Sequence, residues 1–376
     1  MLAKMLPKTD NSDLFYQLAL TMIEGIGAKS ALALLRHFGD AGAIFKASLK
    51  ELKMVDGLGE HRARAIKNHD TFREAAQEID FLQKHDIQAL FLEHPSYPQR
   101  LKQCNDAPVL VYYKGAADLN TSKVVAIIGT RKNSDYGEKL TGELVAGLKA
   151  AEGVLIVSGL AHGIDGIAHR LALKEGIPTV GVVGHGLDTI YPPSHRSLAR
   201  QMQEGSNGGL LTEFPSGTKL SPANFPVRNR LVAGMCDVTV VVESKEKGGA
   251  MITAYMAASY NREVAVFPGR VGDAKSEGPL KLIRNQVASL ICGSQHLLEL
   301  MGWQATPKKK PVQPQLLLAL NEDEQKIVTL LHDQEAVHTD ELMLQTGFSS
   351  AALAAHLLQL EMQGLVKSLP GKRYRL

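Results

Sequence analysis

Six short apolar runs recur between residues 124 and 267 of the chain. They are VVAII at 124–128, VLIV at 154–157, TVGVV at 179–183, GLLT at 209–212, VTVVV at 238–242 and VAVF at 264–267. Stretches predicted to be helical separate most of them and lie at 136–151, 166–175, 195–204 and 250–260. Continuous apolar strands that alternate with helices form a parallel sheet covered on both faces. The pattern predicts an α/β fold, a Rossmann-like, doubly wound domain over residues 124–303.

The sequence before this domain is organised differently. Residues 1–85 contain two copies of the pattern apolar–x–Gly–apolar–Gly, each followed by a polar helix start, with glycines at 25 and 27 and again at 57 and 59. Two such copies resemble a helix-hairpin-helix domain, in which the glycines can expose backbone N–H groups to a DNA phosphate. A helical turn that binds nothing explains the same glycines equally well. Residues 86–123, with their prolines and one apolar strand, are predicted to form a connector.

After the α/β domain, the composition changes twice. Residues 304–315 read QATPKKKPVQPQ, which predicts a linker. Residues 316–376 have three helical stretches followed by a hairpin that turns at Pro370-Gly371. Three helices and a hairpin predict a winged helix-turn-helix domain.

Charge and cysteine content exclude several classes of protein. The 42 Lys and Arg residues against 39 Asp and Glu leave a net charge of only +3, whereas a protein that coats duplex nucleic acid is usually far more basic. A nucleic-acid site must therefore be local. Cys104, Cys236 and Cys292 lack CxxC spacing, so neither a zinc site nor a disulfide framework is expected. No signal-peptide pattern and no run of 18 apolar residues occur, so we expect a cytoplasmic protein without a membrane span.

The loops that follow the strands are the expected binding site, because ligands of doubly wound sheets bind at the carboxyl ends of the strands. The first of these loops contains Gly129, Thr130 and Arg131. It is neither GxGxxG nor GxxxxGK[ST], so no dinucleotide or other cofactor is expected. A glycine, a hydroxyl and an arginine suit an isolated phosphate.

Two further loops suggest anion positions. Ser158 and Gly159 follow the second strand and offer a hydroxyl and N–H groups at a predicted helix start. Gly248 and Gly249 precede another helix, whose N-terminus attracts anions.

A possible metal site lies in the same region. His162, Asp165 and His169 have the spacing i, i+3, i+7 and could share a helical face. Two histidines and one carboxylate match a metal site poorly. We expect no metal, with Asp165 as a helix N-cap and His169 hydrogen-bonded to a loop.

The stretch TEFPSGTKLSPANFPVRNR at 212–230 follows the fourth strand and combines aromatic, cationic and amide side chains. Aromatic residues interleaved with cations are the usual platform for single-stranded nucleic acid. The alternative is that the phenylalanines are core and the arginines are surface residues, but prolines on both sides favour a rigid, shaped loop. The candidate residues, besides Phe214, are Lys219, Asn224, Phe225, Arg228, Asn229 and Arg230.

These motifs together resemble the DNA processing protein A family, also called Smf. The matching motifs, in family order and spacing, are GTR at 129–131, SGLAHGID at 158–165, GLDTIYPP at 186–193, FPVRNR at 225–230, GGAMITA at 248–254 and FPG at 267–269. The resemblance covers roughly the whole chain. It implies a non-catalytic protein that binds single-stranded DNA, forms a homodimer through its Rossmann domain, and loads a RecA-type recombinase onto incoming strands during natural transformation.

The resemblance also assigns site residues. By position, Arg131 and the Ser158-Gly159 turn are similar to the phosphate pocket of the family, and residues 225–230 to its base-contacting side. Gly248-Gly249 stands where the family usually has a serine-glycine turn, which removes one hydroxyl contact.

Two other functions remain open. Nucleoside-monophosphate-processing enzymes of the lysine-decarboxylase-like Rossmann group carry PGGxGTxxE, but GGAMITAY lacks that acid and Glu243 stands alone at a strand end. A transcription factor would read bases with cations on its recognition helix. The corresponding SSAALAAHLLQLEMQG has none, and the basic residues lie in the hairpin at Lys367, Lys372, Arg373 and Arg375.

Overall fold

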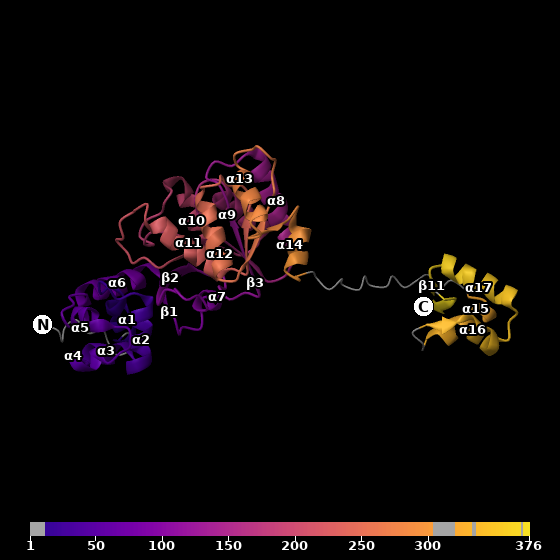
Figure 1. Ribbon diagram of the computed structural model, residues 1–376, viewed down its shortest axis with the longest axis horizontal. Helices are drawn as coiled ribbons and strands as arrows, with labels where there is room; N and C mark the ends of the chain where they lie inside the picture. Colours follow the sequence, from indigo (N-terminus) through magenta and orange to yellow (C-terminus); the bar gives the residue numbers. More distant parts are fainter. Residues whose placement is uncertain (1–11, 304–319, 333–335, 370) are drawn as a thin grey trace. The chain divides into compact units, whose positions relative to one another are not determined.

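The computed structural model describes residues 12–303, 320–332, 336–369 and 371–376 (Figure 1). The chain divides into two compact units, residues 1–305 and residues 306–376, which are considered separately. The predicted linker at 304–315 lies outside the described residues. Among the helices of the described segments, none combines the length and the apolar character needed to cross a membrane.

The first unit is built on a nine-stranded sheet with the order β1-β2-β6-β5-β4-β3-β7-β8-β9. From β6 to β9 all neighbouring strands are parallel, and β3 lies at the point where the strand order reverses. The parallel strands are β3 (Lys123–Ile128), β4 (Val154–Ser158), β5 (Thr179–Val182), β6 (Gly208–Thr212), β7 (Val238–Val241), β8 (Glu263–Val266) and β9 (Ser289–Leu290). All six predicted strands and the doubly wound fold are confirmed.

Helices cover both faces of this sheet because successive residues of its strands point to opposite faces. In β3, Val125 and Ile127 pack with one group of helices, and Val124 and Ala126 with the other. The first group comprises α8 (Asp135–Leu148), α9 (Ile164–Glu175) and α14 (Ser294–Leu300). The second comprises α7 (Gln99–Lys102), α11 (Asn224–Met235), α12 (Gly249–Ser259) and α13 (Glu277–Arg284). A smaller cluster lies under α10 (Arg196–Glu204).

The segment predicted as a connector, 86–123, instead extends the sheet. Its strands β1 (Gln88–Phe91) and β2 (Leu110–Gly115) pair with each other, and β2 pairs antiparallel with β6. The α/β domain therefore begins well before residue 124. A short apolar run carries no information about its partner strand, which explains the difference.

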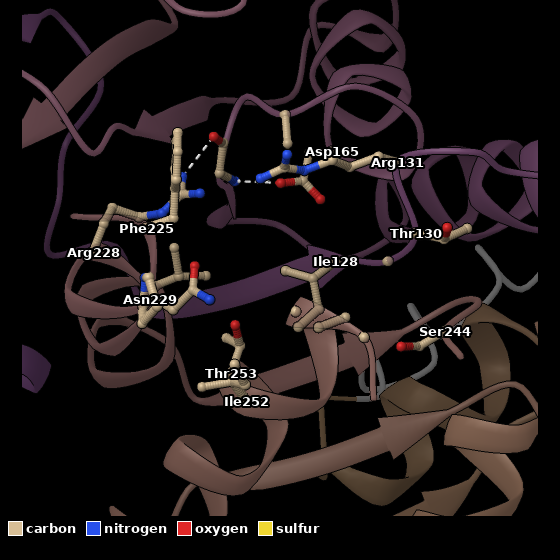
Figure 2. A pocket seen from close by; sticks show the side chains of 18 of the residues that line it. Ile128, Thr130, Arg131, Asp165, Phe225, Arg228, Asn229, Ser244, Ile252 and Thr253 are labelled. Atoms are coloured by element: carbon tan, nitrogen blue, oxygen red, sulfur yellow. Dashed lines mark hydrogen bonds between the residues drawn. The ribbon is translucent and has the colours of Figure 1, made fainter. Parts of the chain in front are cut away.

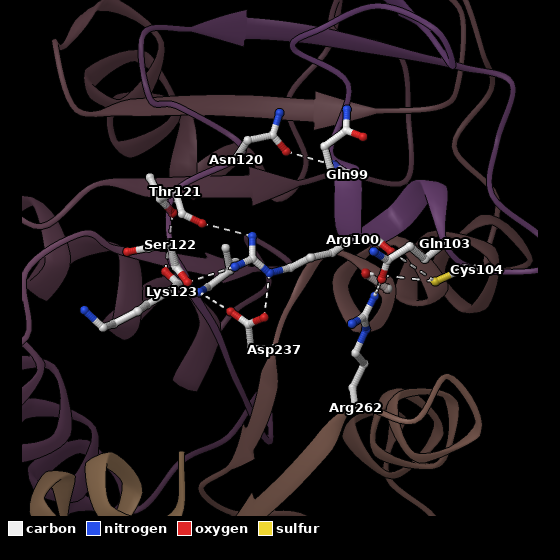
Figure 3. Close-up of polar contacts among 12 residues, drawn as sticks. Gln99, Arg100, Gln103, Cys104, Asn120, Thr121, Ser122, Lys123, Asp237 and Arg262 are labelled. Carbon is white, nitrogen blue, oxygen red and sulfur yellow. Dashed lines mark hydrogen bonds and ion pairs between the residues drawn. The ribbon is translucent and has the colours of Figure 1, made fainter. Parts of the chain in front are cut away.

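One arginine joins this added segment to the parallel sheet (Figure 3). Arg100 of α7 forms an ion pair of 2.6 Å with Asp237 and donates to the carbonyl oxygens of Thr121 and Ser122. Asp237 in turn accepts from the N–H of Val124. The cluster lies at the amino ends of β3 and β7, opposite the edge where ligands of such sheets bind.

The helical region before the sheet packs directly onto β1 and β2. Its helices are α1 (Ser12–Thr21), α2 (Ala28–Phe38), α3 (Ala41–Lys46), α4 (Leu49–Lys53), α5 (Gly59–Lys67) and α6 (Phe72–His85). They share one apolar cluster with Phe91, Leu110 and Tyr112 of the strands. Arg62 donates to the carbonyl oxygens of Gly25 and Gly57, so it links the two glycine turns.

The second unit has the predicted winged-helix architecture. It contains α15 (Glu322–His332), α16 (Thr339–Thr346) and α17 (Ser350–Met362), and a sheet of β10 (Val337–His338), β11 (Lys367–Leu369) and β12 (Arg373–Arg375). One apolar cluster joins the helices. Of the predicted Pro370-Gly371 turn, Pro370 lies outside the described residues.

Candidate nucleic-acid interface

A cavity of about 690 Å³ opens at the carboxyl ends of β3, β4 and β7, beside the first turns of α9, α11 and α12 (Figure 2). Its position is the one expected for a ligand site in a doubly wound sheet. Nine of the thirteen predicted site residues line it, namely Gly129, Thr130, Arg131, Gly159, Phe225, Arg228, Asn229, Gly248 and Gly249. The four outside its lining are Ser158, Lys219, Asn224 and Arg230.

The loop after β3 is held tightly against the start of α9. A Cβ atom on Gly129 would lie 2.5 Å from Cγ1 of Ile164, and a Cβ atom on Gly163 would lie 2.2 Å from the carbonyl oxygen of Thr130. The N–H of Thr130 donates to the carbonyl oxygen of Glu243 at 2.8 Å. These contacts fix the backbone that carries Arg131.

Arg131 and two aromatic rings form one wall of the cavity. The Arg131 guanidinium lies over the Phe225 ring, 5.3 Å from its centroid. The Tyr191 ring lies 5.8 Å from the Phe225 ring, tilted by 44°. Tyr191 was not among the predicted site residues, although it belongs to the quoted GLDTIYPP motif. A cation beside two partly exposed aromatic rings can take a phosphate and an unpaired base together.

The segment 212–230 is not one loop, because α11 begins at Asn224. Pro226 is compatible with this helix since residues of the first turn need no intrahelical N–H donor. Phe225 and Asn229 are four residues apart and both line the cavity. The predicted loop is therefore wrong for its last seven residues, 224–230.

Arg230 and Arg228 do not present free cations to a ligand. Arg230 forms an ion pair with Glu213 and donates to the carbonyl oxygen of Asp106, outside the cavity. Arg228 is 5% exposed and donates to the carbonyl oxygens of Gly159 and Val182, which follow β4 and end β5. Burial lowers the pKa of Arg228 to about 10, so it stays cationic at neutral pH. Its charge lies beneath the cavity surface.

Two of the other residues outside the lining, Lys219 and Asn224, contact each other. The Asn224 side-chain amide donates to the carbonyl oxygen of Lys219 at 3.3 Å. The predicted ligand contacts of both residues thus have no support in the geometry of the cavity.

The geometry does not favour the predicted anion position at Ser158 and Gly159, although Gly159 lines the cavity. Ser158 is fully buried and its hydroxyl donates to the carbonyl oxygen of Ile127 at 2.6 Å. The Gly159 N–H donates to the Asp165 carboxylate, and α9 begins only at Ile164. The absence of a side chain at Gly159 instead makes room for Arg228, because a Cβ atom on Gly159 would lie 2.4 Å from the Arg228 guanidinium.

The metal interpretation also fails on geometry. Asp165 is engaged with Gly159, and the N-cap of α9 is Gly163 rather than Asp165. His169 is buried, and its Nδ1 lies 2.7 Å from the hydroxyl oxygen of Thr179, which belongs to β5 and not to a loop. Burial lowers the pKa of His169 to about 3. Within the described ranges, no three His, Cys, Asp or Glu side chains are grouped as metal ligands.

The opposite wall of the cavity is the N-terminus of α12, as predicted for Gly248-Gly249. Gly248 is the N-cap, and a Cβ atom there would lie 2.3 Å from the Ser244 hydroxyl. Lys245 and Lys247 line the cavity beside it. Both lysines were visible in the motif VVESKEKGGA but were not predicted as site residues, since their direction depends on the turn.

Glu243, the acid considered for an enzyme, has a structural role. Its carboxylate accepts from the N–H of Ser134 at 2.9 Å and from the Ser134 hydroxyl, at the N-cap of α8. It lines a different cavity, of about 270 Å³.

Comparisons with known proteins agree with this architecture. Residues 88–302 match the family model described as DNA recombination-mediator protein A, residues 310–372 match the DprA winged helix domain, and residues 18–69 match the SAM-like helix-hairpin-helix tandem. Protein Smf of Synechocystis sp. is 32% identical over 400 residues, covering 97% of this chain and 99% of that protein.

Two solved structures are similar at the level of fold and sequence. The X-ray structure of DNA processing protein A (DprA) from Streptococcus pneumoniae has a TM-score of 0.63 and 29% identity, covering 79% of this chain and 99% of that one. The structure of DNA processing protein A from Helicobacter pylori, which concerns its single-stranded DNA binding mode, has a TM-score of 0.51 and 30% identity. It covers 58% of this chain and 97% of that one.

Proposed function

Because the chain belongs to the DNA recombination-mediator protein A family, whose role is DNA processing in recombination, we propose that its 690 Å³ cavity binds single-stranded DNA. The observation that carries the proposal is the Arg131 guanidinium over the Phe225 ring, with Tyr191 beside it. The relative from Helicobacter pylori has a described single-stranded DNA binding mode, which supports the same ligand here.

The proposed roles follow from chemistry. Arg131 donates to a phosphate through charge-assisted hydrogen bonds. Lys245, Lys247 and the N-terminus of α12 attract a neighbouring phosphate from the other wall. Phe225 and Tyr191 offer ring surface to a base. A base must leave the duplex stack before it can reach a ring inside a cavity, so single strands are favoured over duplex.

We propose that binding involves no catalysis. Glu243, which a nucleoside-monophosphate-processing enzyme would use as its acid, is hydrogen-bonded to Ser134 away from the cavity. Incubation of the purified protein with nucleoside monophosphates tests this point, and release of free base would refute it.

We further propose that the protein acts as a homodimer and loads a RecA-type recombinase during natural transformation. Both proposals rest on the family. The apolar stretches at 250–260 and 264–267 lend the dimer little support, because most of their residues are buried against the sheet. Light scattering of a protein lacking residues 304–376 tests dimerisation through the first unit, and a monomeric mass at micromolar concentration would refute it. Filament assembly by a recombinase on protein-coated strands tests loading.

Competition between single-stranded and duplex DNA over a salt series tests the central proposal. Besides Arg228, which is buried and hydrogen-bonded to two carbonyl oxygens, three cations line the cavity, namely Arg131, Lys245 and Lys247. If each neutralises one phosphate, the slope of log K against log salt on single strands should be about −2. Equal affinity for the two forms of DNA would refute the proposal.

A further inference from the structure

Helix α12 has an exposed stripe of large apolar side chains that the packing of the domain does not explain. Ile252 is 43% exposed and Tyr255 is 41% exposed, whereas the neighbouring Met251, Thr253 and Ala254 are buried. Residues three apart lie on the same face of a helix. Ile252 and Tyr255 therefore form a continuous exposed surface, which we call the α12 stripe.

The α12 stripe begins inside the cavity and leads out of it. Ile252 lines the cavity (Figure 2). Lys247 and Gly249 line it as well. Tyr255 lies one turn further along the helix, outside the lining residues. The exposed face of α12 thus leads from the cavity at Ile252 to Tyr255.

Cations border the α12 stripe on the side of α13. Lys281 of α13 forms an ion pair of 2.8 Å with Glu246. Helix α13 packs against α12, because a Cβ atom on Gly278 of α13 would lie 2.7 Å from the sulfur of Met251 of α12. The hydrogen bond to Glu246 raises the pKa of Lys281, and Tyr255 adds to this effect. An exposed ion pair contributes little stability, so Lys281 can exchange the Glu246 carboxylate for a phosphate at small cost.

The size of the α12 stripe argues against a stable protein interface. Such interfaces bury roughly 800 Å² on each partner, far more than two half-exposed side chains supply. A partly exposed aromatic ring next to a cation and continuous with a cationic cavity suits a single strand, in which every base has a face that can stack.

We propose that single-stranded DNA leaves the cavity along the α12 stripe, with a base stacked on Tyr255 and its phosphate bound by Lys281. This inference rests on the proposed function and extends it by one nucleotide subsite. It predicts a step in affinity when an oligonucleotide becomes long enough to reach Tyr255.

Oligothymidylates from about 4 to about 15 nucleotides, a range that covers the usual site sizes, test the step by fluorescence anisotropy. Tyr255→Leu keeps an apolar side chain and removes the ring. It should weaken binding of the longer oligonucleotides roughly fivefold or more and leave the shortest ones unchanged, as expected for the loss of one stacked base. Tyr136→Leu is the matched control, because Tyr136 is 55% exposed on α8, which covers the other face of the sheet.

The proposed contact between Lys281 and a phosphate is tested separately, by the salt dependence of binding. Lys281→Gln should reduce the salt slope on long oligonucleotides by about one unit. Lys139→Gln is the matched control, since Lys139 is an exposed lysine of α8 that is also paired with a glutamate, Glu143. It should leave the slope unchanged.

Three results would overturn the inference. One is an unchanged length dependence in Tyr255→Leu. Another is quenching of 2-aminopurine, placed at successive positions, that is the same in the wild type and Tyr255→Leu. The third is a lower mass of Tyr255→Leu in light scattering without any effect on DNA, which would make the α12 stripe a protein interface. Failure of the proposed function looks different, because then Arg131→Ala would leave even short oligonucleotides bound.

Discussion

Replacement of Gly163 by alanine tests whether the start of α9 holds the backbone of Arg131. Gly163 has φ +74° and ψ −130°, a conformation that residues with a Cβ atom rarely adopt. Its Cβ atom would lie 2.2 Å from the carbonyl oxygen of Thr130 and 2.8 Å from the carbonyl carbon of Arg131. Both clashes are with backbone, so a side-chain rotation cannot relieve them.

The expected loss of stability has two sources. Backbone strain costs about 1–3 kcal/mol, and forcing the loop away from α9 costs about 1–3 kcal/mol in overpacking. Together they predict a lower free energy of unfolding by about 2–6 kcal/mol and a fall in Tm of roughly 3–10 °C for a unit of this size. DNA affinity should fall roughly tenfold or more, because the phosphate contact of a displaced arginine contributes about 1.5–3 kcal/mol.

Gly176→Ala is the control at the other end of α9. Gly176 also has φ +74°, but it adopts the left-handed helical conformation and a Cβ atom there would meet nothing within 4 Å. It should cost about 1–2 kcal/mol and leave DNA binding unchanged. Calorimetry gives the Tm values, and fluorescence anisotropy well below them gives the affinities. A destabilised Gly163→Ala protein that binds DNA normally would refute the role of the Arg131 loop.

Four further predictions concern DNA binding. Arg131→Ala should weaken single-strand binding roughly tenfold to a hundredfold with normal melting; unchanged anisotropy titrations would place the site elsewhere. Arg230→Ala should leave affinity unchanged and lower the Tm, because Arg230 is paired with Glu213; loss of binding without loss of stability would contradict its position. Phe225→Ala should lower affinity with little change in salt slope, since stacking releases no counterions; a fall of about one unit would mean that the ring acts by positioning Arg131. Deletion of 304–376 should preserve affinity for short oligonucleotides, measured beside the full chain; a large loss would assign the winged helix to the primary site.

Much of the fold is readable from local patterns. Apolar runs of four to six residues separated by helical stretches specify buried parallel strands, because both faces of such strands must be covered. The first two strands, at 88–91 and 110–115, show the limit of this reasoning. Their place at the edge of the sheet depends on pairing with β6, about one hundred residues later in the chain.

Some residues of the site could be predicted from the sequence, and others could not. Arg131 lies in the loop directly after β3, and Gly248 lies at the N-terminus of the helix that follows β7. The carboxyl ends of parallel strands converge at one edge of the sheet, so the meeting of these residues in one cavity could be predicted. Tyr191 lies nine residues after the end of β5, and Lys247 lies in the turn between β7 and α12. The course of these turns sets the direction of both side chains, and the residues themselves do not specify that course.

Arg228 and Arg230 illustrate what remained for the tertiary structure. As residue types, they are equivalent candidates for a phosphate. Two positions along a helix correspond to about 200° of rotation, so the side chains point in nearly opposite directions. One joins the ends of β4 and β5, and the other pairs with Glu213. The sequence by itself determined the doubly wound sheet, the flanking domains and the edge of the sheet at which the cavity lies, because these follow from periodicity. Only the tertiary structure decided which cations are free, because that depends on carbonyl groups and carboxylates brought close by distant parts of the chain.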